Sequence, residues 1–156
     1  MKFILYCLVI LAELSIDQYS KFVIVRDFSL HQSIEIIKDF FSITYVQNFG
    51  AGFSILQNAK IFLSVVSISV IVMLTYYFFE NKRKKDYFNK TAYLLIIGGA
   101  LGNLVDRLKQ DFVVDFLDFK IFGYDFPVFN FADCFITVGC FILIIAILLE
   151  QKHAKN

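Results

Sequence analysis

The segment from Ile61 to Phe79 contains nineteen consecutive residues without a charged side chain (IFLSVVSISVIVMLTYYFF). An α-helix needs about 20 mostly apolar residues to cross the hydrocarbon core of a bilayer, so this segment predicts a transmembrane helix. The composition agrees, because 58% of the 156 residues are hydrophobic and only 19% are charged. A water-soluble domain is excluded, since a domain of this size buries only about two-thirds of its chain's surface.

The charge balance bears on two further classes of protein. A disordered tail combines low hydrophobicity with a high net charge, and this chain has neither. A nucleic-acid binder carries an excess of basic residues, whereas 15 basic and 14 acidic residues leave this chain a net charge of only +1. We therefore expect no nucleic-acid partner and a single integral-membrane domain over residues 1–156.

Three other apolar segments are too short to cross a bilayer alone. They contain ten, fifteen and sixteen uncharged residues, at 3–12, 91–105 and 134–149. Each becomes long enough only when it includes nearby ionisable residues. We therefore predict a mostly α-helical membrane protein, a bundle of four transmembrane helices with spans at about 3–24, 60–80, 90–108 and 131–150.

Lysine and arginine are unevenly distributed around these spans. The segment 80–90 (ENKRKKDYFNK) holds five basic residues in eleven, and more lysines flank the first and last spans. In contrast, Lys38 is the only basic residue between Asp27 and Ala59. Because loops rich in Lys and Arg stay in the cytoplasm, we expect both termini to be cytoplasmic.

The segments expected outside the membrane carry strand and turn patterns. Phe40–Val46 (FFSITYV) is β-branched and aromatic, which predicts a strand, and Gln47–Gly52 (QNFGAG) predicts a turn. Val113–Phe119 is apolar, with Asp115 and Asp118 between the apolar residues. We expect a small extracytoplasmic β-sheet on the membrane surface and a short connecting segment.

Several ionisable residues gather at the outer end of the predicted bundle. Such a residue inside a transmembrane segment costs about 2.5–3.5 kcal/mol on insertion scales, so each is a candidate functional residue. Span three ends at Asp106, span four begins near Asp133, and Asp115 lies between them. The first span brings Asp17 and Lys21 to the same face of the membrane.

The spacing of four residues places Glu13, Asp17 and Lys21 on one face of the first helix, which we expect to point into the bundle. A structural role stays open for each charged group, because it can pair with a neighbouring charge or suit a helix end. On that interpretation the protein is a non-enzymatic scaffold. A proton-coupled carrier is another alternative, although transporter sites tend to lie near the membrane midplane.

A cluster of acids without a neighbouring histidine favours carboxylate chemistry. Two close carboxyl groups resist double ionisation, so one of them keeps its proton near neutral pH. The ionised member can then take a proton from water while the protonated member polarises a carbonyl, as in aspartic proteases. The sequence offers three candidates for this pair, Asp106, Asp115 and Asp133.

Five short motifs follow one another along the chain: Asp17–Lys21 (DQYSK), Asn48–Phe53 (NFGAGF), Gly98–Arg107 (GGALGNLVDR), Val113–Phe116 (VVDF) and Phe129–Asp133 (FNFAD). With these motifs and its four predicted spans, the chain resembles the lipoprotein signal peptidases, also called signal peptidase II, over nearly its whole length. Two small residues depart from the family's usual choice. Gly52 stands where the family has Ala or Ser, and Cys134 stands where Ser is common.

The resemblance implies an aspartic endopeptidase of the bacterial cytoplasmic membrane with its active site at the extracytoplasmic face. The family removes the signal peptide from prolipoproteins and cuts before a cysteine that carries a diacylglyceryl group. Its partners would thus be the diacylglyceryl prolipoprotein and membrane lipid, with no metal or organic cofactor. We expect the protein to be a monomer.

The resemblance also implies that Asp115 and Asp133 are the catalytic pair. Asp106 is the runner-up, because a carboxylate ion-paired with the adjacent Arg107 is a poor proton carrier. Other matched residues are expected to bind the substrate or to support the aspartates: Asp17, Lys21, Asn48, Gly50, Asn103, Asp106, Arg107, Asn130 and Ala132. The small residues Gly98, Gly99, Ala100 and Gly102 are interpreted as packing residues that let helices approach closely.

Overall fold

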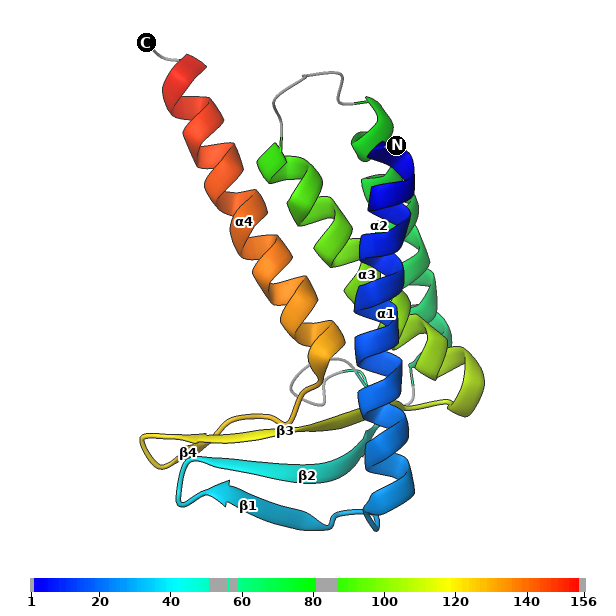
Figure 1. The fold of residues 1–156 in the computed structure, drawn as a ribbon, viewed down its shortest axis with the longest axis vertical. Coiled ribbons are helices and arrows are strands. Elements are labelled where there is room, and N and C mark those ends of the chain that lie inside the picture. Colours follow the sequence, from blue (N-terminus) through cyan, green and yellow to red (C-terminus); the bar gives the residue numbers. More distant parts are fainter. Residues whose placement is uncertain (1, 51–55, 57–58, 81–86, 155–156) are drawn as a thin grey trace.

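The computed structural model describes residues 2–50, 56, 59–80 and 87–154. Within these residues four long helices stand side by side, and an antiparallel sheet crosses one end of the bundle (Figure 1). The helices are α1 (Lys2–Asp27), α2 (Lys60–Glu80), α3 (Tyr87–Gln110) and α4 (Phe131–Ala154). The strands are β1 (Ser33–Ile37), β2 (Phe41–Asn48), β3 (Val113–Ile121) and β4 (Tyr124–Asp125).

All four predicted spans are helical. Three helical segments are long and apolar enough to cross a membrane: Phe3–Asp27, Lys60–Glu80 and Phe131–Gln151. The third predicted span, in α3, is not among them. This helix contacts each of the other three, and its Ala92 is fully buried. Because much of its surface faces protein, α3 can be less apolar than a helix that faces lipid.

Close helix contacts explain the glycines of α3. A Cβ atom on Gly99 would lie 2.4 Å from the backbone oxygen of Ala132 in α4, and one on Gly102 would lie 2.6 Å from Asp17 Oδ2 in α1. Both distances are shorter than van der Waals contact, so only a residue without a side chain fits. The interpretation of these glycines as packing residues is confirmed.

The sheet has the strand order β1-β2-β3-β4. The predicted strand at 40–46 is confirmed but continues further, because Gln47 and Asn48 still pair with β3. The prediction of a turn from Gln47 was therefore wrong for these two residues, whereas Phe49 and Gly50 do form a bend. The rest of that turn, from Ala51 on, lies outside the described residues. The predicted apolar segment at 113–119 forms most of β3, whereas β1 and β4 were not predicted.

The register divides the sheet into two unlike faces. Along β3, Asp115, Leu117, Phe119 and Ile121 alternate with residues of the opposite face, among them Asp118. The opposite face is apolar at Val114 and Phe116, close to the helices, and polar further along, where Thr44 Oγ1 lies 2.7 Å from Ser33 Oγ and donates to Asp118 Oδ2 at 2.6 Å. Asp115 bonds the residue that precedes α4, whereas Val114 and Phe116 on the other face pack against Ile24 of α1. Both faces of this part of β3 therefore meet the helices.

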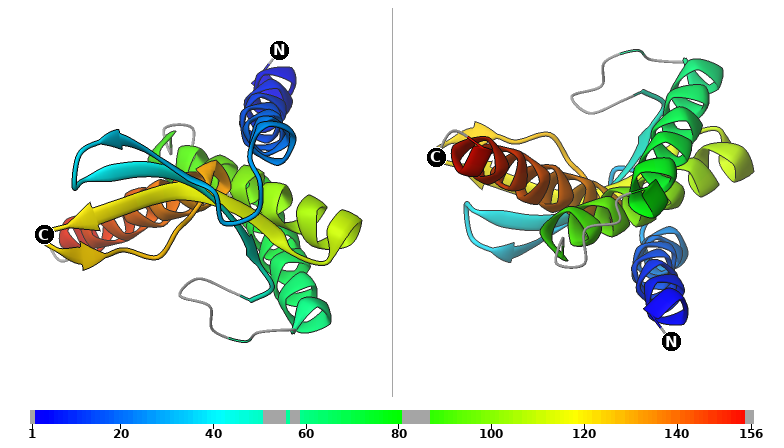
Figure 2. Two further views of the ribbon diagram at one scale, coloured as in Figure 1. Left: turned by 90° about the horizontal axis from the view of Figure 1, so that it is seen from below. Right: turned by 90° about the horizontal axis from the view of Figure 1, so that it is seen from above.

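A small core joins the sheet to α1 and places Asp115. Val114 and Phe116 are both buried and pack against Ile24 of α1 and Tyr45 of β2. These two apolar neighbours anchor the backbone on each side of Asp115. The strand can therefore present the Asp115 carboxyl group at the end of the bundle. From below, Figure 2 shows the strands crossing this end and extending to the side on which α4 lies.

Candidate active site

The start of α4 is built around Asn130 and Asp133. The backbone N–H of Asp133 donates to Asn130 Oδ1 at 3.0 Å, and the backbone N–H of Asn130 donates to Asp133 Oδ2 at 3.2 Å. This reciprocal pair is a capping box, in which two otherwise unpaired N–H groups at a helix start are satisfied. The box holds the Asp133 carboxylate in the first turn of α4.

Asp115 reaches the same place from β3. It is only 2% exposed, and its carboxyl group accepts hydrogen bonds from Asn130 Nδ2 at 2.6 Å and Asn48 Nδ2 at 2.9 Å. Burial and, next, the charge of Asp133 raise the pKa of Asp115 to about 7. This carboxyl group can therefore keep or release a proton near neutral pH.

Two asparagine side chains connect the two aspartates. The Asn130 amide donates to Asp115 and also to Asn103 Oδ1 at 3.2 Å. The Asn103 amide in turn donates to Asp133 Oδ1 at 2.7 Å. Asn supplies a donor and an acceptor without taking up a proton itself. The two amides therefore hold the carboxyl groups while leaving proton transfer to the acids.

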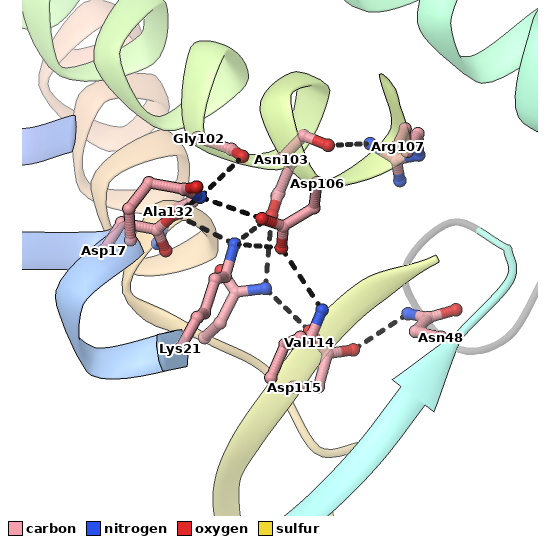
Figure 3. Close-up of polar contacts among 12 residues, drawn as sticks. Asp17, Lys21, Asn48, Gly102, Asn103, Asp106, Arg107, Val114, Asp115 and Ala132 are labelled. Carbon is pink, nitrogen blue, oxygen red and sulfur yellow. Dashed lines mark hydrogen bonds and ion pairs between the residues drawn. The ribbon is translucent and has the colours of Figure 1, made fainter. Parts of the chain in front are cut away.

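Beside this pair, Lys21 of α1 joins two further acids (Figure 3). Its ammonium group lies 2.9 Å from both Asp17 Oδ2 and Asp106 Oδ2. Gln18 adds a donor to Asp106 Oδ1 at 2.8 Å. All three ionic side chains are at least 96% buried. As expected, this face of α1 points into the bundle.

The same acids hold the backbone of the site. Asp17 Oδ1 accepts the backbone N–H of Ala132 at 3.0 Å, close to the start of α4. Asp106 Oδ2 accepts the backbone N–H of Val114 at 3.2 Å, next to Asp115 (Figure 3). Each contact fixes the residue adjacent to one of the two predicted catalytic aspartates. The ion-pair cluster therefore positions both β3 and α4.

Arg107 serves a different part of the site. Its guanidinium group donates to the backbone oxygens of Gly50 at 3.1 Å and Asn103 at 3.4 Å. Asn48 Oδ1 accepts the backbone N–H of Gly50 at 2.9 Å. Asn48, Gly50 and Arg107 are thus brought together with Asp115. Gly52, the first of the two departures, lies outside the described residues.

A cavity of about 490 Å³ opens over the aspartates. Its polar end is formed by Asp115 and Asp133 together with Asn48, Asn103 and Arg107. Its remaining wall is mostly apolar and comes from β3, the segment before α4 and the first turns of α4: Val113, Phe126, Pro127, Val128, Phe129, Cys134, Ile136, Thr137 and Val138. A reacting group at the acids would therefore lie beside a surface suited to apolar chains.

The structure brings all eleven predicted site residues to one end of the bundle, but it changes one partner. Asp106 is ion-paired as expected, yet its cation is Lys21 rather than the adjacent Arg107. Arg107 points away from Asp106, because neighbouring residues of an α-helix point about 100° apart, 3.6 residues completing one turn. Two features were not predicted from the sequence. One is the contact of Gln18 with Asp106, although Gln18 lies inside the Asp17–Lys21 motif. The other is the apolar wall formed by residues 126–129.

The cluster is rich in acids, yet its geometry is not that of a metal site. Among the described residues, no group of three or more His, Cys, Asp and Glu is placed to hold a metal ion. The carboxylate oxygens instead accept hydrogen bonds from Lys21, from asparagine amides and from backbone N–H groups. The arrangement is suited to exchanging a proton between two carboxyl groups in a site with an open cavity.

Comparison with known proteins places this geometry in a family. A profile described as signal peptidase (SPase) II matches residues 9–149. Two lipoprotein signal peptidases of Staphylococcus aureus are 39% and 38% identical to the chain over 140 residues, which cover 90% of this chain and 85% of theirs.

Solved structures agree with the sequence relatives. A bacterial membrane enzyme determined in meso at 2.3 Å resolution superposes with a TM-score of 0.88 at 35% identity and covers 95% of this chain and 90% of its own. A second, at 1.9 Å resolution, has a TM-score of 0.82 at 36% identity, with 92% of each chain covered. With its three membrane-span candidates, the protein is a multi-pass membrane peptidase, and the chain belongs to the signal peptidase II family.

Proposed function

We propose that this peptidase removes the signal peptide from prolipoproteins by hydrolysing the bond before a diacylglyceryl-modified cysteine. The observation that carries the proposal is the single cavity in which Asp115 and Asp133 lie next to an extended apolar wall. The scissile peptide would lie at the polar end. The lipid tails would stay in the bilayer beside the apolar residues of α4.

In the proposed mechanism the two aspartates activate one water molecule. Burial and the nearby Asp133 charge support a protonated Asp115, because they raise its pKa to about 7. Asp133 would take a proton from water, while Asp115 would donate a hydrogen bond to the peptide carbonyl. The resulting tetrahedral diol would collapse as a proton passes to the leaving amine. No metal or organic cofactor enters these steps.

The runner-up, Asp106, is disfavoured by its contacts. Its two oxygens accept from Gln18, Lys21 and the backbone N–H of Val114. A carboxylate whose oxygens already accept from three donors has little capacity left for a substrate. We therefore assign Asp106 a supporting role together with Asp17 and Lys21.

The remaining polar residues are proposed to hold the substrate. Asn48, Asn103 and Arg107 line the cavity. At its polar end, the Asn130 amide donates to Asp115, and the backbone oxygen of Gly50 accepts from Arg107. An extended peptide has free backbone groups that amide and guanidinium side chains can bind. The outer sheet and the segment 40–54, of which 51–54 lie outside the described residues, would clamp this peptide.

The proposed membrane arrangement has four spans within one domain. The described part of α1 begins, and that of α4 ends, at the end of the bundle opposite the sheet (Figure 1). α2 ends at Glu80 and α3 begins at Tyr87 at that same end, and the sequence between and next to them, 80–90, is the basic segment. The positive-inside rule then places both termini in the cytoplasm and the aspartates at the extracytoplasmic face. We propose a monomer as the active form.

The proposed function can be tested with purified protein in proteoliposomes. The substrate is a prolipoprotein whose cysteine carries diacylglyceryl, and the control is the same precursor without the lipid. We expect cleavage of the lipidated precursor only, with a product that mass spectrometry identifies as starting at the modified cysteine. Equal cleavage of both precursors, or a cut at another bond, would contradict the proposal.

A further inference from the structure

Lys21 touches neither of the two proposed catalytic aspartates, yet it contacts the amide that bonds one of them. We propose that Lys21 is a positioning residue: by donating to Asn103 Oδ1, it sets the direction of the Asn103 amide and so aims its NH2 group at Asp133. This inference rests on the proposed function of Asp115 and Asp133 as the catalytic pair.

The first step of the argument is that Lys21 can only donate. An ammonium group has three hydrogens and no acceptor. Lys21 Nζ has three acceptors within reach, Asp17 and Asp106 at 2.9 Å and Asn103 Oδ1 at 3.1 Å. The Lys21 residue is 3% exposed, so water does not offer a ready substitute for any of them. The side chain is held in one place, with one hydrogen directed at Asn103.

The second step is that this hydrogen selects one of two amide orientations. Asn103 Oδ1 accepts from Lys21 and from Asn130 Nδ2. Its Nδ2 is therefore the end that faces Asp133, at 2.7 Å. In the reversed orientation the NH2 group would face two donors and the oxygen would face a carboxylate. All three contacts would become repulsive. Asn130 and Asp133 thus favour the observed orientation as well, and Lys21 adds the charged donor that holds the Asn103 oxygen in place.

The third step is that the second amide is fixed without Lys21. Asn130 Oδ1 accepts the backbone N–H of Asp133, which leaves its Nδ2 to bond Asp115 and Asn103. The two aspartates are therefore supported differently. Asp115 accepts from the neutral amides of Asn130 and Asn48. Asp133 accepts from the Asn103 amide, which is itself held by the charged Lys21. Loss of Lys21 should thus disturb Asp133 in particular.

A simpler role for Lys21 would be to neutralise Asp17 and Asp106. The double variant Lys21→Met/Asp17→Asn separates the two roles, since it removes one positive and one negative charge together. Asn at position 17 keeps the oxygen that accepts the Ala132 N–H. Met has nearly the shape of Lys but donates nothing to Asn103. The references are Lys21→Met alone and the wild-type protein, whose cluster carries the same net charge as the double variant. If neutralisation were the role of Lys21, adding Asp17→Asn to Lys21→Met would restore kcat.

The experiment measures kcat, KM and the melting temperature of full-length protein in proteoliposomes. Asp106 loses its cation in the double variant, so the melting temperature of this variant should fall, and rates are compared per folded protein below that temperature. We expect a kcat about ten- to a hundredfold below that of the wild type, the size of effect given by losing a charge-assisted contact. KM should change less than kcat, because Asn48 and Arg107, two of the residues proposed to hold the substrate, are untouched. Wild-type kcat in the double variant, or a change in KM alone, would overturn the proposal.

A second variant keeps the test decisive if Lys21→Met impairs folding. Asn103→Asp retains an acceptor for Lys21 but has no donor for Asp133. We expect it to fold and to lose kcat, and wild-type kcat would overturn the proposal. Asp115→Asn and Asp133→Asn serve in the same assay as a reference. If both remain active, the proposed function itself fails; if both are inactive while the Lys21 variants are normal, only this inference fails.

Discussion

At the scale of single residues, the environment of Asp115 is the most informative feature of the protein. In β3 Asp115 stands between the buried Val114 and Phe116, and its own side chain, also buried, lines the same cavity as Asp133. Burial and the Asp133 charge both raise the pKa of Asp115, which reaches about 7. An ordinary aspartate would be ionised at that pH. The surroundings therefore prepare this group to act as an acid.

The pH dependence of the reaction follows from this raised pKa. Above about pH 7, Asp115 loses the proton that the proposed mechanism needs, and the pair then carries two negative charges. We expect kcat to fall on the alkaline side, with a midpoint near pH 7. The measurement is a kcat profile between pH 5 and 9, and a rate that stays constant up to pH 9 would contradict the assignment. The midpoint belongs to the coupled pair rather than to one residue.

Removing the neighbouring charge should change the titration of Asp115. In Asp133→Asn the repulsion between the carboxylates is lost, so the pKa of Asp115 should fall below about 7. Burial remains, so the pKa should stay above that of a free aspartate. Infrared spectroscopy of protein with ¹³C-labelled aspartate can follow the carboxyl band, with Asp111→Asn as a distant control. An unchanged midpoint would show that the two carboxyl groups do not interact.

At the scale of elements, the contact between α1 and α3 determines where the site forms. Gly102 leaves the space that the Asp17 carboxylate occupies, and Asp17 in turn holds the backbone N–H of Ala132. Through this contact, the packing of α1 against α3 influences the first turn of α4. Helix packing and active-site geometry are therefore coupled through a single acidic side chain.

The variant Gly102→Ala tests this coupling. Its Cβ would lie 2.6 Å from Asp17 Oδ2, so we expect a stability loss of about 1–3 kcal/mol, as is typical of overpacking, together with a reduced kcat. Gly139→Ala is the matched control, because it crowds α3 and α4 near Ile96 and Leu95 instead. The control should lose stability but keep its kcat. A wild-type kcat in Gly102→Ala would contradict this prediction, because it would show that the packing of α1 against α3 does not influence catalysis.

Much of this element arrangement was predictable from the sequence, and its limits have physical causes. Long apolar segments predicted the helices, and the alternation of spans predicted that the acids meet at one end. β1 and β4 were missed because a five-residue edge strand and a two-residue strand carry little pattern. The pairing of Asp106 with Lys21 was missed because it joins helices far apart in the sequence. Such a contact depends on tertiary packing, which local spacing does not encode.

At the scale of the whole molecule, the two faces of the sheet bear on how the protein lies in the membrane. The face that carries Asp115 also carries Leu117, Phe119 and Ile121. The opposite face carries the buried Val114 and Phe116 near the helices and Asp118 and Lys120 in the part of β3 that extends beyond them. The strands extend to the side of the bundle on which α4 lies (Figures 1 and 2). In the proposed arrangement, the apolar face would therefore rest on lipid beside α4.

Two adjacent positions in β4 can test this placement. Tyr124 pairs with Ile121 and shares the apolar face, whereas Asp125 pairs with Lys120 and shares the polar one. The chain has no tryptophan, so Tyr124→Trp and Asp125→Trp each introduce a single fluorophore. We expect brominated lipids to quench the fluorescence of Tyr124→Trp more strongly. Equal quenching, or stronger quenching of Asp125→Trp, would show that the sheet does not rest on the bilayer by this face.

The account as a whole depends on Asp115 and Asp133 acting together as the catalytic pair. The most direct measurement is the cleavage rate of a lipidated precursor in proteoliposomes by Asp115→Asn, Asp133→Asn and the runner-up variant Asp106→Asn, each at wild-type protein levels. We predict that the first two lose activity by about 10²- to 10⁴-fold, the usual contribution of an acid–base group, while Asp106→Asn keeps measurable cleavage. Full cleavage by Asp115→Asn, with loss of activity in Asp106→Asn, would contradict this account and assign the chemistry to Asp106.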